Sequence, residues 1–314
     1  MAVCRWERSP MNTRAQIGLL PDGKRLHLSD GPIDIVLQAF GATSHVHEAY
    51  RAAADRFLSV LDELCAELPL LREPVFAGTV APTGRIARRM FHAVLPYAAN
   101  VFITPMAAVA GAVAEEILHS MDVAAPGLSR AYVNDGGDIA LYIGDGERFS
   151  VGMVDRPEQP SLFGATLLDS VQPVRGVATS GWRGRSFSFG IADAVTVLAR
   201  TAAMADAAAT IIGNAVDLPL HPAIIRRAAC ELAPDSDLSD RLVTVDVGGL
   251  TAREVRSALG YGVECAADLI NGGLIEAAAL RLQGETRVVS QAVNLMQSER
   301  LHIRESGNLM APRA

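Results

Sequence analysis

The chain has 314 residues, of which 50% are hydrophobic and 20% are charged, a composition typical of a globular protein. Its formal net charge of −7 argues against binding to duplex nucleic acid, which needs a basic surface. The four cysteines lie far apart in the sequence and fit neither a zinc site nor a disulfide framework. We therefore expect a single domain over residues 1–314, with mobile ends at 1–10 and 298–314.

The beginning of the chain does not read as an export signal, because Arg5, Glu7 and Arg8 interrupt any apolar segment. The most apolar run, residues 101–114, is too short to span a bilayer and contains Pro105. Without a run of basic residues, an anionic membrane surface is not favoured either. These features predict a cytoplasmic protein with no membrane or nucleic-acid partner.

The first elements are read from turn signals and from apolar spacing. Short alternating runs within residues 17–39 are divided by two Asp-Gly turns, which predicts a hairpin followed by a third strand. Over residues 44–68 apolar side chains recur at three- and four-residue steps, which predicts a helix. We expect Pro69 to end this helix, because proline cannot continue it.

The next part of the chain predicts two further helices. The first covers residues 83–95, and its arginines either face solvent or bind phosphate. The dipeptide at 104–105 is Thr-Pro, a typical helix start. Residues 106–120 are rich in Ala and Gly, so another element can approach this helix closely. Glu115 and Glu116 on it are either an acid pair or part of a solvated face. The arginines of the first helix are Arg85, Arg88 and Arg89.

Residues 131–143 predict two strands joined by the turn NDGGD. Its two adjacent glycines form either a simple hairpin turn or a loop that lets a ligand approach the backbone.

Helices and strands mix along the chain without strict alternation, which favours an α+β fold. The other expected elements are a strand at 149–154 ending in a turn at 155–157, a helix at 223–232, a strand at 241–247, a helix opened by a capping box at 251–254, a helix or strand at 274–283, and a last strand at 286–294.

Residues 176–214 hold most of the candidate chemistry. Here a strand runs into a tight turn, where Thr179 and Ser180 offer hydroxyl groups and Gly181 lets the backbone approach a ligand. Arg183 and Arg185 follow in a glycine-containing loop. A pair of guanidinium groups suits phosphate, although an ordinary surface loop explains these residues nearly as well.

The helix at 201–214 carries Asp206 and Thr210 on one face, because the two residues are four apart. Aspartate inside a helix costs stability relative to alanine, so Asp206 needs a partner. One interpretation is a hard-oxygen site for Mg²⁺, completed by backbone carbonyls, water and a substrate phosphate. The other is that Asp206 caps or pairs with a neighbouring loop. A separate acidic loop at 234–240 lacks the glycine and the final glutamate of a calcium loop.

Four segments of the chain resemble the ApbE superfamily, the FAD:protein FMN transferases. The family's hallmarks are a GGD turn, a TSG turn and a helix with the pattern A-D-a-x-a-T, and the recognisable core here covers about residues 100–215. The resemblance implies an α+β, T-fold-like core with mixed antiparallel sheets and packed helices. The matching segments are VNDGGDI at 133–139, ATSG at 178–181, RSF at 185–187 and VTVLARTAAMADAAAT at 195–210.

The resemblance also implies a site and an activity. The family transfers FMN from FAD to a threonine hydroxyl of a flavoprotein, with AMP leaving, and Mg²⁺ assists the attack at phosphorus. On this chain Asp206 and Thr210 would be the catalytic metal ligands. The expected flavin ligand, FAD or FMN, would be held by Gly136, Gly137, Asp138, Thr179, Ser180, Gly181 and Arg185.

Two departures from the family pattern leave two interpretations of function open. The transferases carry a segment HHI-x-DP-x-TG between the TSG turn and the helix, where this chain has FSFGIADAV with Asp193 and no histidine. The transferases are also commonly exported, which makes this chain a divergent, cytoplasmic branch. It is either a transferase or a non-catalytic flavin- or nucleotide-binding protein, such as an accessory of a redox enzyme. Its apolar excess favours a homodimer.

Overall fold

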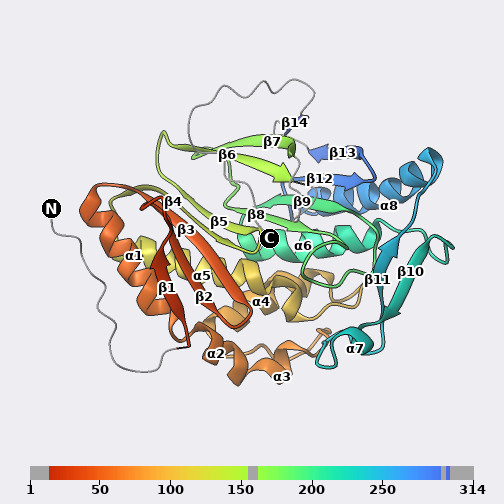
Figure 1. Ribbon diagram of the computed structural model, residues 1–314, viewed down its shortest axis with the longest axis horizontal. Coiled ribbons are helices and arrows are strands. Elements are labelled where there is room, and N and C mark those ends of the chain that lie inside the picture. Colours follow the sequence, from red (N-terminus) through yellow and green to blue (C-terminus); the bar gives the residue numbers. More distant parts are fainter. Residues whose placement is uncertain (1–13, 155–161, 291–294, 298–314) are drawn as a thin grey trace.

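The computed structural model describes residues 14–154, 162–290 and 295–297. The expected mobile ends and the expected turn at 155–157 lie outside these described residues. A nine-stranded antiparallel sheet runs through the molecule (Figure 1). In spatial order its strands are β1 (Gln16–Leu19), β2 (Leu26–Asp30), β3 (Ile33–Gly41), β4 (Leu128–Asp135), β5 (Asp138–Ile143), β8 (Gly176–Ser180), β9 (Ala194–Ala199), β12 (Ala277–Leu282) and β13 (Glu285–Ser290).

One face of this sheet is covered by a row of helices. They pack in the order of the strands beneath them, from β3 at one end to β13 at the other. The shorter helix α4 (Arg85–Val94) packs against the outside of the row. Among the described residues no helix is both long and apolar enough to cross a bilayer. The helices of the row are α1 (Thr43–Phe57), α5 (Val109–Ala124), α6 (Ala202–Ala215) and α8 (Ala252–Asn271).

The opposite face of the sheet is covered by a small antiparallel sheet of β14 (Leu295–Gln297), β7 (Leu162–Asp169) and β6 (Arg148–Val154). Side chains of both sheets share one apolar cluster, which includes Ile139 of β5 and Phe149 of β6. The molecule therefore has a helical layer, a central sheet and a partial third layer. This arrangement of antiparallel sheets and packed helices confirms the predicted α+β class.

Several elements match their prediction. The first three strands form the predicted hairpin and third strand, and β4 and β5 form the predicted pair around the NDGGD turn. Helix α8 opens with the predicted capping box, in which the side chains of Thr251 and Glu254 each accept a backbone N–H of the other residue. The segment at 274–283, left open between helix and strand, contains β12. The expected last strand is β13, with residues 291–294 outside the described part of the chain.

Two helix predictions are wrong. Residues 223–232 contain β10 (Ile224–Ala228) and only a four-residue helix α7 (Ala229–Leu232). Tertiary pairing decides this outcome, because β10 forms an antiparallel ladder with β11 (Leu242–Val247). The helix expected at 44–68 is divided into α1, α2 (Val60–Ala66) and α3 (Leu68–Leu71). Pro69 lies in the first turn of α3, where proline fits a helix, rather than at a helix end. The remaining short helices are η1 (Leu95–Tyr97) and η2 (Pro105–Ala108).

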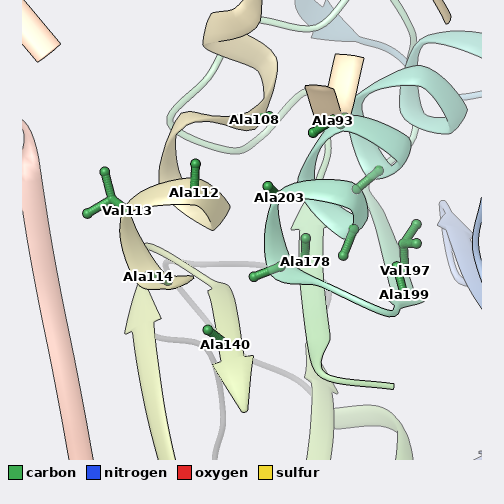
Figure 2. Close-up of a cluster of buried hydrophobic side chains, with 14 of the residues drawn as sticks. Ala93, Ala108, Ala112, Val113, Ala114, Ala140, Ala178, Val197, Ala199 and Ala203 are labelled. Carbon is green, nitrogen blue, oxygen red and sulfur yellow. The ribbon is translucent and has the colours of Figure 1, made fainter. Parts of the chain in front are cut away.

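Helices α5 and α6 approach each other closely, as the small residues of the predicted helix indicated. A Cβ atom on Gly111 of α5 would lie 2.4 Å from the carbonyl oxygen of Ala202 at the start of α6. Figure 2 shows the surrounding cluster, in which Ala112 of α5 and Ala203 of α6 lie above Ala140 and Ala178 of the sheet. Small side chains thus allow two helix backbones to pack directly against one another and against the strands.

We predict that Gly111→Ala destabilises the protein by about 1–3 kcal/mol, because the added methyl group meets backbone atoms that cannot move aside locally. The matched control is Gly260→Ala in α8, where an added Cβ has nothing within 4 Å. There the substitution should stabilise the helix by up to about 1 kcal/mol. Urea denaturation of the two variants measures both effects. Equal effects of the two substitutions would contradict the close packing of α5 on α6.

Candidate ligand-binding site

All nine candidate residues proposed from the sequence line one pocket. It lies between the β4–β5 turn, the end of β8 with the loop that follows, and helix α6. The sequence places these three segments up to about seventy residues apart, and the antiparallel sheet brings them together. The candidate residues in its lining are Gly136, Gly137, Asp138, Thr179, Ser180, Gly181, Arg185, Asp206 and Thr210.

The β4–β5 turn forms one wall of the pocket. Gly136 and Gly137 have φ angles of +63° and +115°, which residues with a side chain rarely adopt. The turn is held by Asn134, whose Oδ1 accepts the N–H of Gly137 at 2.8 Å. Asp138 follows as the first residue of β5, and its Oδ1 accepts the N–H of Thr179 at 3.2 Å. This bond ties the GGD turn to the TSG turn.

The TSG turn forms a second wall. The hydroxyl of Thr179 is hydrogen-bonded to that of Thr196 at 2.9 Å. A Cβ atom on Gly181 would lie only 2.4 Å from the carbonyl oxygen of Asp193. The absence of a side chain at Gly181 is therefore required by backbone packing. A contact between Gly181 and a ligand stays a prediction.

The two arginines of the following loop do not act as a pair. Arg183 stacks on the ring of Trp182, 4.1 Å from its centroid, and forms an ion pair with Asp193 at 3.2 Å. Arg185 lines the pocket and donates from Nη2 to the carbonyl oxygen of Pro32 at 3.2 Å. Of these two arginines, Arg185 places its guanidinium beside the GGD turn, and a contact between it and a phosphate stays a prediction.

Helix α6 supplies the floor of the pocket with Asp206 and Thr210. The Oδ2 atom of Asp206 accepts the N–H of Gly111 at 3.1 Å, in the first turn of α5. In return, Oε1 of Glu115 on α5 accepts the N–H of Ala203 at 2.7 Å, in the first turn of α6. A carboxylate at a helix N-terminus satisfies an unpaired N–H and interacts favourably with the helix dipole. The partner of Asp206 is therefore the start of helix α5 and not the neighbouring loop that was offered as an alternative, and each helix supplies a carboxylate to the first turn of the other.

Neither expectation for the glutamates of α5 is correct. Glu115 binds a backbone N–H in the first turn of α6, and Glu116 is only 1% exposed. The carboxylate of Glu116 forms ion pairs with Arg56 of α1 at 2.8 Å and with Arg89 of α4. Arg85 lies 3.7 Å from the same carboxylate. These bonds join three helices around a buried charge, so this segment has a structural role.

The pocket concentrates negative charge. Burial raises the pKa of Asp135 to about 7, and the N–H of Asp34 and the charge of Arg185 only partly offset this effect. Burial also raises the pKa of Asp138, and the nearby carboxylates of Asp206 and Asp135 raise it further. Burial likewise raises the pKa of Asp206, while N–H donors from the start of α5 lower it. Such a site favours the binding of a cation or the retention of protons.

The donor set fits one kind of metal. Within the described ranges no three His, Cys, Asp or Glu side chains are grouped so that they could hold a metal ion. The pocket instead offers two carboxylates, Asp138 and Asp206, and the hydroxyl of Thr210. Mg²⁺ uses hard oxygen ligands, and it is usually bound by one or two carboxylates together with water and substrate phosphates. The residues present therefore fit Mg²⁺ and offer no soft ligand for other metals.

A second cavity, about 280 Å³ in volume, adjoins the first and shares Asp138, Arg185, Asp206 and Thr210 with it. Its far walls are largely apolar, with a few polar side chains, and come from distant segments of the chain. Sequence reasoning missed this cavity, because its loops carry no motif. The one available signal was the pair of phenylalanines in the segment where the transferases have histidines. The additional lining includes Phe102, Met106, Phe187, Phe189, Ile211, Ser236, Asp237 and Leu238.

The fold and the pocket define an α+β protein with an acidic, oxygen-rich candidate site beside a largely apolar cavity. A family model described as "AbpE bacteria" matches residues 17–288. This match covers most of the chain, which therefore belongs to that family, and it confirms the resemblance to ApbE proteins. It extends well beyond the core at about 100–215 that the motifs alone indicated.

Curated relatives carry the name UPF0280 protein. The one from Archaeoglobus fulgidus is 35% identical over 176 residues, which cover 54% of this chain and 67% of the relative. The one from Methanothrix thermoacetophila is 35% identical over 161 residues, which cover 46% of this chain and 60% of the relative. The one from Methanopyrus kandleri is 33% identical over 201 residues, which cover 62% of this chain and 77% of the relative.

Two solved structures are similar to the chain at low identity. The ApbE protein from Thermotoga maritima gives a TM-score of 0.46 at 13% identity, covering 90% of this chain and 97% of the other. The flavinyl transferase ApbE of Pseudomonas stutzeri gives a TM-score of 0.41 at 12% identity, covering 88% and 93%. The assignment to the family rests on the sequence match.

We predict that Asp135→Asn removes part of the pH dependence of stability. A carboxyl group with a raised pKa in the folded chain binds its proton more tightly there than in the unfolded chain. The stabilisation that the protonated Asp135 carboxyl group gives to the folded chain is therefore fully present below the unfolded pKa of about 3.9. It is lost as pH rises through about 7. Across this window, the free energy of unfolding of the variant relative to that of wild type should rise by up to about 1.4 kcal/mol per pH unit.

Denaturant unfolding of both proteins at pH 5, 6, 7 and 8, without added metal, measures the difference directly. The unfolding free energy of both proteins should change with pH, because Asp138 and Asp206 also have raised pKa values. The informative quantity is the difference between the two curves. A difference that stays constant from pH 5 to pH 8 would show that Asp135 does not titrate in this window.

Proposed function

We propose that the chain is a Mg²⁺-dependent flavin transferase, which moves FMN from FAD to a threonine hydroxyl of a flavoprotein. The observation that carries this proposal is the convergence of three separate sequence segments, including the GGD turn and the Asp206–Thr210 helix, on one pocket. Membership in the family supports the same chemistry. A solved structure of low similarity is itself a flavinyl transferase, which is consistent with it.

In this proposal Asp206 and Thr210 hold the metal, and Asp138 faces them across the pocket. Bound Mg²⁺ would neutralise charge on the diphosphate as the phosphorus is attacked. The carboxylates are already fixed in place, because backbone N–H groups of Gly111 and Thr179 bind their oxygens. Fixed ligands need no rearrangement when a metal binds.

The remaining pocket residues suit a flavin dinucleotide. Arg185 would pair with a diphosphate oxygen, because its guanidinium lies beside the bare backbone of Gly136, where an added Cβ would be 3.7 Å from Nη1. The hydroxyls of Thr179 and Ser180 would bind phosphate or ribityl oxygens. The adjoining apolar cavity, with Phe102 and Phe189 in its walls, suits an aromatic ring.

A second function is favoured by one specific observation. Among the described residues that line the two cavities there is no histidine. The segment that replaces the histidine motif is used for packing: Phe189 donates its N–H to Oδ1 of Asn214 at 2.8 Å. A Cβ on Gly190 would lie 2.0 Å from the carbonyl oxygen of Gly213. On this alternative the protein binds a flavin or nucleotide without transferring it, for example as an accessory of a redox enzyme.

We infer one ApbE-like domain that acts in the cytoplasm, with a flavoprotein as the acceptor and a second copy of the chain as a partner. Gel filtration with light scattering would give the oligomeric state. The flavin absorbance of the protein as purified would show whether a flavin is its ligand.

We predict that wild-type protein incubated with FAD, Mg²⁺ and candidate flavoproteins releases AMP and produces a protein band with flavin fluorescence. Asp206→Asn should lower the rate by roughly a hundredfold or more, because a metal ligand loses its charge. The asparagine can still accept the N–H of Gly111, so the fold should persist. Thr210→Val should also lower the rate, because it removes the hydroxyl group that would bind the metal.

The matched control is Asp268→Asn, an exposed aspartate on α8, which should leave the rate unchanged. FAD binding, followed as a rise in melting temperature, separates the two functions. Binding of FAD with neither AMP release nor a fluorescent band would support the binding protein. An unchanged rate in Asp206→Asn would show that Asp206 does not serve a metal in the reaction.

A further inference from the structure

One acidic residue of the second cavity has no assigned role. Asp237 lies in the loop between α7 and β11, and with Ser236 and Leu238 it lines the cavity that also contains Asp206 and Thr210. Its Oδ2 atom accepts the hydroxyl proton of Thr104 at 2.5 Å. This bond orients the carboxylate, and Asp237 is only partly buried where it lines the cavity.

The other carboxylates in the two cavities are bound to the backbone or to a positive charge. Asp138 and Asp206 accept N–H groups and face the proposed metal. Asp193 accepts the N–H of Gln283 at 2.5 Å and forms an ion pair with Arg183. Asp237 has no ion pair with any residue that the structure describes, and its recorded hydrogen bond comes from a side-chain hydroxyl. It is therefore the carboxylate best placed to exchange a proton.

The proposed reaction needs a group that accepts a proton. A threonine hydroxyl attacks phosphorus poorly unless its proton is removed as the new bond forms. Histidine is the commonest such group in enzymes, but the described lining of both cavities contains none. A positioned aspartate performs this task in protein kinases, where it accepts the proton of the substrate hydroxyl.

We propose that Asp237 is the general base of this protein, an inference that rests on the proposed transferase function. The acceptor hydroxyl oxygen forms a bond to the phosphorus of the FMN half of FAD. The bond between that phosphorus and the bridging oxygen breaks, and its electron pair leaves with AMP. The hydroxyl proton passes to the carboxylate of Asp237, which later releases it to water. Thr104 orients the carboxylate through its hydrogen bond.

The test measures AMP release from FAD with Mg²⁺ and a protein extract as the source of acceptor threonines. Asp237→Asn should lower kcat by about 10²–10⁴-fold, the usual contribution of a general base, with little change in KM for FAD. Asp237→Ala should be equally slow and should regain activity when formate is added, because a small carboxylate can enter the space left by the side chain. The matched control is Asp235→Asn, an exposed aspartate of the same loop, which should keep the wild-type rate.

Rescue by formate distinguishes a proton acceptor from a residue that only supports the loop, because formate cannot restore a misfolded cavity. Full activity of Asp237→Asn beside an active wild type would overturn Asp237 as the base and leave the transferase proposal standing. Slow Asp237→Ala that formate does not rescue would also overturn it. If wild type binds FAD but transfers no FMN, the transferase proposal itself fails, and the proposed role of Asp237 fails with it.

Discussion

The close crossing of α5 and α6 is the constraint on which the site depends. The helices meet where Gly111 faces Ala202 without an intervening side chain, and each supplies a carboxylate to the first turn of the other. Asp206 therefore has two duties. One of its oxygens fixes the start of α5, and the carboxylate as a whole lines the pocket. A bulkier residue at the crossing would move Asp206 away from the GGD and TSG turns.

This arrangement places charges where water cannot solvate them fully. Burial raises the pKa values of Asp135, Asp138 and Asp206. The carboxylates of Asp206 and Asp135 raise that of Asp138 further, and the carboxylate of Asp135 also raises that of Asp206. Arg185 is the cationic side chain that lines the pocket near them. A cation bound among these oxygens would remove the repulsion, so ligand binding and folded stability are coupled through the same groups. The acidic pocket is unfavourable for stability alone, and it suits a protein that binds a divalent ion with a phosphate ligand.

The sequence predicted the parts of the structure that local patterns encode. The NDGGD turn follows from two glycines that adopt positive φ angles, and α6 follows from its alanine-rich helical spacing. The nine candidate residues could be named because four short segments that resemble the family carry them. Their convergence could not be derived from spacing, since it depends on how the sheet orders its strands.

The parts that were missed depend on tertiary contacts. Strand β10 has a sequence that also suits a helix, and pairing with β11 decides its conformation. The sequence does not show that Glu116 is buried, because its ion-pair partners Arg56 and Arg89 come from other helices. Asp237 lies in a loop without a motif, so only the folded chain shows that it shares a cavity with Asp206. Contacts between distant segments leave little trace in a single sequence.

We propose that the crossing of α5 and α6 builds a divalent-cation site on one face of α6. Anomalous diffraction from a crystal grown with FAD and Mn²⁺, used in place of Mg²⁺, tests it most directly. We expect one strong manganese peak within coordination distance of a carboxylate oxygen of Asp206 and of the hydroxyl of Thr210. A crystal that contains bound FAD but has its manganese peak elsewhere, or has none, would contradict the account.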